Sequence, residues 1–218
     1  MDDLKISCMH CGVKACQNGE GEKYPPFCPT KNMDKEMLST VLEKYKDDEN
    51  AKTAYTSAMV EADYYCQKTR AEEIIIFAKR MGYKKIGIAN CVGLIDEART
   101  FAKIAENNGL DVYMTSCKIG AVDKSQIGID DAHKINRGCM QESMCNPIMQ
   151  AEFLNRAETE LNVVVGLCVG HDSLFIKHSN ALVTTLVTKD RVLGHNPAAA
   201  LYTSGSYYKR LLEEKIPY

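Results

Sequence analysis

The hydrophobic positions of this chain follow a helical period in its first part and a strand period later. Three stretches carry apolar residues at three- and four-residue spacing, which is typical of amphipathic helices; they begin near Asp34, near Tyr55 and at Thr69. Asp34 is a favourable N-cap residue, and residues 69–72 (Thr-Arg-Ala-Glu) match a capping box. The apolar face of the first helix would consist of Met37, Leu38, Val41, Leu42 and Tyr45.

From residue 85 onwards, short apolar stretches of strand type alternate with helical stretches. The pattern predicts strands at 85–90, 110–116, 162–167 and 181–188, with helices at 94–107, at 147–160 and after Asp172. Alternation of this kind is typical of crossover connections between parallel strands. We therefore expect an α/β fold of Rossmann-like, three-layer type, with a mostly parallel sheet of about four or five strands and flanking helices.

The composition divides the chain into three expected parts. Residues 1–33 contain four cysteines and three prolines without apolar periodicity, so this segment needs an external staple such as a metal. Residues 34–82 are expected to form a helical segment packed on the main domain, and residues 83–218 the α/β domain. Within that domain, residues 118–144 have weak periodicity, which indicates a lid, a binding loop or an unrecognised short helix.

Charge and hydropathy exclude several classes of function. The 218 residues include 27 Lys and Arg against 29 Asp and Glu, so no polybasic surface for nucleic acid or anionic lipid is expected. No apolar run approaches the roughly 20 residues that cross a membrane, and the N-terminus does not resemble a signal peptide. We expect a cytoplasmic protein without nucleic-acid or membrane partners.

The ten cysteines are the strongest chemical signal. In a reducing cytoplasm, clustered cysteines usually bind metal or carry out redox chemistry; a secreted disulfide protein is the alternative, disfavoured by the missing signal peptide. A first set is predicted to form a metal site for zinc or a 4Fe-4S iron–sulfur cluster, because four thiolates make a closed tetrahedral site. It comprises Cys8, Cys11, Cys16 and Cys28, with His10 as a possible replacement ligand. The structural alternative is a zinc knuckle that only staples the N-terminus.

A second set of cysteines follows the predicted strands. Cys91, Cys117 and Cys168 stand at three strand ends, and Cys145 precedes a helix start. Ligands of open parallel sheets bind beyond the carboxyl ends of the strands, and helix N-termini there stabilise thiolates. These four cysteines are predicted to bind a second cluster or to act as redox thiols, although cysteine is also common as a small buried hydrophobic residue.

Cys66 and Cys139 are interpreted differently, as small buried hydrophobic residues without a chemical role.

Polar residues follow the same strand ends and supply candidate catalytic groups. They are His171, Asp172, Arg191 and His195. An imidazole could ligate metal or move protons, and an arginine could bind a carboxylate or phosphate. His171 is the strongest candidate because it shares a loop with Cys168, whereas residues 189–191 could be a solvated turn. The glycine-rich nucleotide motifs and the Gly-x-Ser-x-Gly elbow of hydrolases are absent.

Several motifs together resemble an uncharacterised prokaryotic family. They are Cys8-x-x-Cys11, residues 87–93 (GIANCVG), 145–151 (CNPIMQA), 166–172 (GLCVGHD) and 189–197 (KDRVLGHNP). The family is described as a domain of unknown function with four N-terminal cysteines, proposed to bind zinc, and the likeness runs over essentially the whole chain. The resemblance implies a metal site at the first cysteine set and no established activity.

These observations lead to three functional hypotheses. The leading one is an iron–sulfur redox or lyase-type enzyme that takes a small-molecule substrate and an electron-transfer partner, with the second cysteine set beside its catalytic pocket. The alternative is a zinc-stapled protein that binds a small ligand or regulates without catalysis. A metal-free thiol enzyme that pairs Cys168 with His171 is the third.

Overall fold

The structure, a computed structural model, describes residues 5–137, 139 and 141–216. The chain divides into two compact units, Met1–Met59 and Val60–Tyr218. The boundary falls within helix α2 (Asp48–Tyr64). Among the described residues, no helix combines the length and the apolar character that a membrane crossing needs.

The first unit has little buried apolar surface. It contains two short 3-10 helices, η1 (Ala15–Gln17) and η2 (Gly21–Lys23), followed by α1 (Lys35–Lys44) and most of α2. Asp34 caps α1 by accepting a hydrogen bond from the backbone N–H of Glu36, as its sequence position predicts. None of the residues of α1 is buried, so the apolar face predicted for this helix is exposed.

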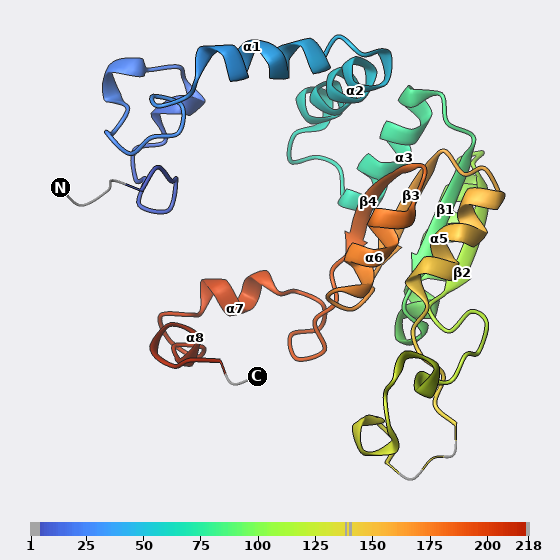
Figure 1. Ribbon diagram of the computed structural model, residues 1–218. Helices are drawn as coiled ribbons and strands as arrows, with labels where there is room; N and C mark the ends of the chain where they lie inside the picture. The colour runs from blue at the N-terminus through green and yellow to red at the C-terminus, as the bar shows by residue number, and fades with distance from the viewer. Residues whose placement is uncertain (1–4, 138, 140, 217–218) are drawn as a thin grey trace. The chain divides into compact units, whose positions relative to one another are not determined.

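The second unit is built on a four-stranded parallel sheet (Figure 1). The strands are β1 (Lys85–Asn90), β2 (Asp111–Ser116), β3 (Leu161–Val165) and β4 (Leu182–Val187). Their order is β2-β1-β3-β4, so β1 and β3 are central and are buried on both faces. This arrangement confirms the predicted α/β class with a parallel sheet of four strands.

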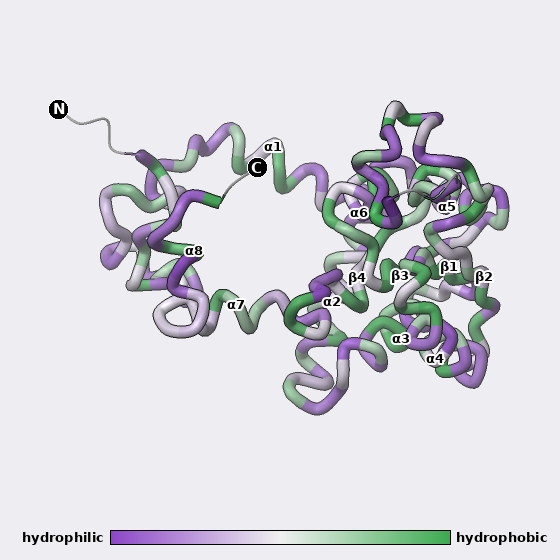
Figure 2. The backbone as a smooth tube through the Cα atoms, turned by 90° about the horizontal axis from the view of Figure 1, so that it is seen from below, coloured by the Kyte–Doolittle hydropathy of each residue, from purple (hydrophilic) through white to green (hydrophobic). Residues whose placement is uncertain are grey.

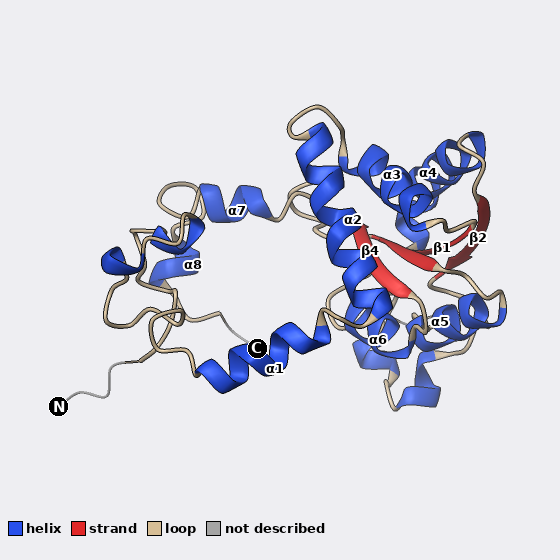
Figure 3. Cartoon of the chain, turned by 90° about the horizontal axis from the view of Figure 1, so that it is seen from above, coloured by secondary structure: helices blue, strands red, loops and turns tan. Residues whose placement is uncertain are grey.

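Helices cover both faces of the sheet. Figure 3 shows α3 and α4 on one face and α5 and α6 on the other, and Figure 2 shows hydrophobic strands between them. The helices of this unit are α3 (Arg70–Met81), α4 (Ile95–Asn107), α5 (Pro147–Arg156), α6 (His171–His178), α7 (Ala198–Tyr202) and α8 (Arg210–Glu213). The capping box predicted at Thr69 and Glu72 is present at the start of α3.

One prediction of secondary structure needs correction, and one open alternative, the unrecognised short helix in 118–144, agrees with the structure. The predicted helix 147–160 ends at Arg156, because Glu158 has a left-handed φ of 54° and Glu160 donates its backbone N–H to Lys85 in the sheet. The weakly periodic stretch 118–144 contains two short 3-10 helices, η4 (Lys124–Ile127) and η5 (Asp131–His133). The sequence pattern also did not predict α7 and α8.

Candidate functional site

The register of the sheet places two of the predicted cysteines side by side. Asn90 of β1 and Ser116 of β2 are partners in the parallel ladder. Cys91 and Cys117 are the residues that follow them directly in the sequence. The backbone N–H of Cys117 donates to the carbonyl oxygen of Asn90 at 2.8 Å, which continues the ladder. Neighbouring parallel strands lie about 4.8 Å apart, so these two thiols extend from adjacent points of the sheet edge.

A third cysteine reaches the same place from far along the chain. The Sγ atoms of Cys145 and Cys117 are 3.7 Å apart. The backbone N–H of Asn146 donates to the carbonyl oxygen of Cys117 at 2.8 Å, which fixes the approach of the second segment. The residues between the two cysteines therefore form a loop that is closed at its base by a pair of thiols.

Ion pairs and hydrogen bonds connect the described residues of this loop to one another. The side chain of Lys134 is only 3% exposed and lies 2.8 Å from a carboxylate oxygen of Asp131 and 3.6 Å from one of Asp123. The ammonium group of Lys124 pairs with Glu142. Lys118 donates from Nζ to the carbonyl oxygen of Ser143 at 2.6 Å, directly beside Cys145. The sequence suggested a lid, a binding loop or a short helix here. In the structure, the loop brings Cys145 back to Cys117.

A buried side-chain amide forms hydrogen bonds with the ends of the two strands that precede Cys91 and Cys117. Gln150, on the first turns of α5, donates from Nε2 to the carbonyl oxygens of Asn90 at 3.2 Å and of Thr115 at 2.8 Å. These two oxygens belong to the strand residues just before Cys91 and just before Ser116. Gln150 thereby ties α5 to the ends of both strands.

Two cations that follow β4 contact the thiols. Nζ of Lys189 lies 3.2 Å from Sγ of Cys91, and a guanidinium nitrogen of Arg191 lies 3.0 Å from Sγ of Cys168. The backbone N–H of Asp190 donates to Nδ1 of His195 at 3.1 Å, closing the turn that presents both cations. The segment that follows β4 thus places one positive charge beside Cys91, which follows β1, and another beside Cys168, which comes after β3.

These contacts change the acidity of the thiols. A hydrogen bond from the Cys117 thiol, supported by the backbone N–H of Gly93 and by Lys189, lowers the pKa of Cys91 to about 4. A hydrogen bond from the same thiol, with the positive charges of Lys118 and His171, lowers the pKa of Cys145 to about 5. The two flanking thiolates and burial raise the pKa of Cys117. These contacts favour the thiolate forms of Cys91 and Cys145 and the protonated form of Cys117.

The predicted catalytic residues lie at this edge but have unequal access to the sulfurs. Arg191 contacts Cys168, and the charge of His171 acts on Cys145. The carboxylate of Asp172 accepts a hydrogen bond from the backbone N–H of Ser173 at 2.7 Å, so it is engaged within α6. His195 supports the turn after β4 through Asp190 rather than facing a thiol.

Cys168 differs from the other three strand-edge cysteines because its sulfur contacts a guanidinium group and no other thiol in the described structure. The carbonyl oxygen of Cys168 accepts the backbone N–H of His171 at 2.9 Å. No hydrogen bond links the His171 imidazole to the Cys168 thiol in the part of the chain that the structure describes, so the thiol–imidazole pair that the third hypothesis needs is not formed.

The first cysteine set lies in an irregular segment. The backbone N–H of Cys11 donates to the carbonyl oxygen of Cys8 at 3.1 Å, forming the expected turn. Cys8 and Cys16 are exposed, whereas Cys28 is buried and its pKa is lowered by the backbone N–H of Lys31. Within residues 5–137, 139 and 141–216, no three His, Cys, Asp or Glu side chains stand as a ligand set for a metal ion. The metal site of this set stays a prediction.

The interpretation of Cys66 and Cys139 as buried residues is wrong. Both side chains are exposed. Cys66 follows the end of α2 with a left-handed φ of 55°, and Cys139 lies in the loop that precedes α5. The described neighbours of Cys66 are turn residues, which provide no apolar layer that could cover its side chain.

Sequence reasoning did not select Lys118 or Gln150, and it placed residues 189–191 after the last strand without giving Lys189 a role. Lys118 and Lys189 each lie two residues after a strand ends, so the rule that identified the cysteines could also have selected them. Gln150 gave no such signal, because a glutamine on a helix is ordinarily a surface residue.

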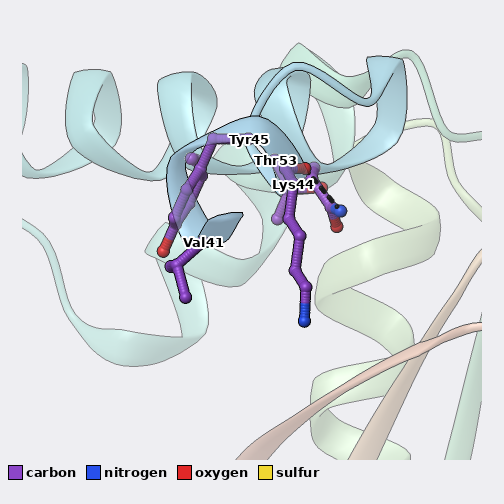
Figure 4. A pocket seen from close by; sticks show the side chains of 6 residues that line it. Val41, Lys44, Tyr45 and Thr53 are labelled. Carbon is purple, nitrogen blue, oxygen red and sulfur yellow. Dashed lines mark hydrogen bonds between the residues drawn. The ribbon is translucent and has the colours of Figure 1, made fainter. Parts of the chain in front are cut away.

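A separate groove of about 510 Å³ lies in the first unit (Figure 4). Its lining comes from the end of α1 and the start of α2: Val41, Lys44, Tyr45, Asn50, Thr53 and Ala54. It contains no thiol, imidazole or carboxylate, so we do not assign the chemistry of the chain to it.

Comparison with known proteins identifies the family. Residues 28–186 match the family described as "Protein of unknown function (DUF1847)". The chain belongs to this family. The matched range includes all four strand-edge cysteines and Cys28, but not Cys8, Cys11 or Cys16.

A relative from Methanocaldococcus jannaschii, described as an uncharacterized protein, is 48% identical over 210 residues, which cover 96% of this chain and 100% of the relative. No solved structure matches the chain.

Proposed function

We propose that this protein is a redox enzyme whose reactive centre is the dithiol of Cys117 and Cys145 at the edge of the parallel sheet. The observation that carries the proposal is the distance of 3.7 Å between the two Sγ atoms, which are supplied by separate segments. Oxidation would shorten this separation to the S–S bond length of about 2.05 Å. Charges of Lys118 and His171 support the thiolate form of Cys145.

The two cysteines have different roles in the proposed reaction with a small disulfide substrate. Cys145 is partly exposed, so its thiolate attacks one sulfur of the substrate, and the first substrate thiolate leaves. The buried Cys117 then attacks Sγ of Cys145, forms the protein disulfide and expels the second substrate thiolate. The two leaving thiolates take up one proton from Cys117 and one from solvent. One substrate disulfide thus becomes two thiols while two protein sulfurs form one disulfide.

A second candidate is the iron–sulfur redox or lyase centre predicted from the sequence. It is favoured by the N–H groups that donate to thiol sulfur, from Val92 to Cys117 at 3.3 Å and from Lys189 and Arg191 to Cys91 and Cys168, because such bonds tune cluster potentials. In the present arrangement these thiols do not form a metal ligand set, so we derive no reaction step through a cluster. A zinc-stapled binding or regulatory protein without catalysis is the further alternative.

Reaction of the reduced protein with a small aromatic disulfide, followed by peptide mass mapping, tests the proposal. The unchanged protein should end with Cys117 and Cys145 joined. The Cys117→Ser variant should stop at a mixed disulfide between the reagent and Cys145, and the Cys66→Ser variant serves as the matched control. An unreactive Cys145 in metal-free protein would contradict the dithiol proposal.

Analysis of iron, sulfide and zinc in anoxically purified protein separates the candidates. A dithiol centre leaves the partly exposed Cys145 and Cys168 free to react with an alkylating reagent, whatever metal the N-terminal segment holds. Iron and sulfide that are lost together in the Cys168→Ser variant would favour the iron–sulfur candidate instead.

A further inference from the structure

Cys91 is a third thiol in contact with the proposed dithiol, and the reaction described above does not use it. It is buried, with 7% of its surface exposed, so a substrate does not reach it as readily as it reaches Cys145. Cys117, which follows the last register pair of β1 and β2 as Cys91 does, is also its hydrogen-bond partner. Cys117 is therefore the middle member of a row of three sulfurs.

The backbone geometry permits a bond on either side of Cys117. Disulfides join residues whose Cα atoms lie about 4.4–6.8 Å apart, and residues in register on adjacent parallel strands satisfy this condition at about 4.8 Å. The backbone N–H of Cys117 donates to the carbonyl oxygen of Asn90 at 2.8 Å, which holds Cys117 beside the end of β1. The backbone N–H of Cys91 donates to Val165 of β3 at 3.0 Å, which fixes Cys91 on the other side.

We propose that Cys91 is a further catalytic residue, which accepts the disulfide from the Cys117–Cys145 pair and stores it as a buried Cys91–Cys117 bond. This inference rests on the proposed dithiol function. The Cys91 thiolate attacks Sγ of Cys117, the Cys91–Cys117 bond forms as the Cys117–Cys145 bond breaks, and Cys145 leaves as a thiolate. No electron or proton enters or leaves, because one thiolate replaces another.

Positive charge lies beside both outer cysteines, Cys91 and Cys145, so either one can leave as a thiolate and the exchange is reversible. Lys189 stabilises the thiolate of Cys91 at 3.2 Å, and Lys118 and His171 stabilise that of Cys145. The backbone N–H of Val92 donates to Sγ of Cys117 at 3.3 Å and orients the sulfur that both neighbours attack. Exchange returns the accessible Cys145 to its reactive form while the oxidised pair lies inside the protein.

The test follows the position of the disulfide in time. Reduced full-length protein is mixed with one equivalent of an aromatic disulfide, quenched in acid at intervals, alkylated and mapped by mass spectrometry. We expect Cys117–Cys145 to appear first and Cys91–Cys117 to follow, with both bonds present at the end because each flanking thiolate has a cation beside it. In the Cys91→Ser variant the first bond should persist, and in the Cys139→Ser control the sequence of events should be unchanged.

The outcomes separate this inference from the function on which it rests. If Cys117–Cys145 forms and Cys91 remains fully alkylated at all times, the transfer to Cys91 is refuted while the dithiol function stands. If Cys145 gives no disulfide with Cys117 in any variant, the proposed function itself fails.

Discussion

The side-chain amide of Gln150 donates to the carbonyl oxygen of Thr115 at 2.8 Å, and both residues are buried. Thr115 of β2 is in register with Ala89 of β1, so Gln150 adds a donor from the helix layer to a carbonyl group of the parallel ladder. Gln150 thereby couples α5, which begins just after Cys145, to the strand that ends just before Cys117.

The Gln150→Leu variant tests this coupling. We expect the free energy of unfolding to fall by about 1–3 kcal/mol, because two buried hydrogen bonds to Asn90 and Thr115 are lost, each worth about 0.5–1.5 kcal/mol. Denaturant unfolding measures the loss, and the rate of Cys117–Cys145 disulfide formation should fall with it. The exposed Gln126→Leu is the matched control and should change neither quantity.

The reactivity of Cys145 should depend on pH in an unusual range. Its pKa is lowered from 9.0 to about 5, so its alkylation rate should rise through pH 5 and be level at neutral pH. In the unfolded chain the rise should occur near the ordinary thiol pKa of about 8.5. A rise near pH 8 in the folded protein would contradict the assigned charge environment.

The same lowered pKa links stability to pH. Because the folded pKa lies below the unfolded one, the thiolate of Cys145 contributes stability that is full above about pH 9 and is lost as pH falls through about 5. Between these pH values the unfolded state binds more protons than the folded state, so the free energy of unfolding should rise with pH. Denaturant midpoints should show a smaller rise in the Cys145→Ser variant than in the unchanged protein.

Lys189→Met removes the ammonium group that lies 3.2 Å from the sulfur of Cys91. The pKa of Cys91 should rise, because a positive charge no longer favours the thiolate. A pH titration of thiolate absorbance, compared with that of Cys91→Ser, measures the shift. The exposed Lys177→Met controls for the loss of a lysine, and an equal effect of both variants would refute the assigned contact.

Gly87 of β1 should not tolerate a side chain. A Cβ there would collide with the side chains of Asn162 and Leu154, which pack on this face of the sheet. We expect Gly87→Ala to lower the free energy of unfolding by about 1–3 kcal/mol or more through overpacking. Gly205→Ala, where a Cβ meets no atom within 4 Å, is the control. Denaturant unfolding measures both variants.

Metal should affect the N-terminal segment if the first cysteine set binds it. We expect chelator treatment to speed proteolysis within residues 5–33, because this segment has few buried side chains to hold it together. Cys11→Ser should remove the bound metal and reproduce the effect, with Cys66→Ser as control. Equal cleavage rates with and without metal would argue against a staple.

The hydrophobic pattern was sufficient to predict the sheet. The strand at Lys85–Asn90 was predicted with its observed bounds, because a short apolar stretch between helical stretches is compatible with few structures besides a buried parallel strand. The end of α5 was predicted too late, because a left-handed φ at Glu158 leaves no mark in hydrophobic periodicity.

The candidate site was predicted only in part. The sequence determined that cysteines follow three strands, and topology alone then requires them to share one edge of the sheet. It did not determine which sulfurs touch. The contact of Cys145 with Cys117 depends on the fold of residues 118–144, and that of Lys189 with Cys91 on a turn closed by His195. Such contacts depend on distances of a few ångströms between remote segments, and only tertiary packing sets them.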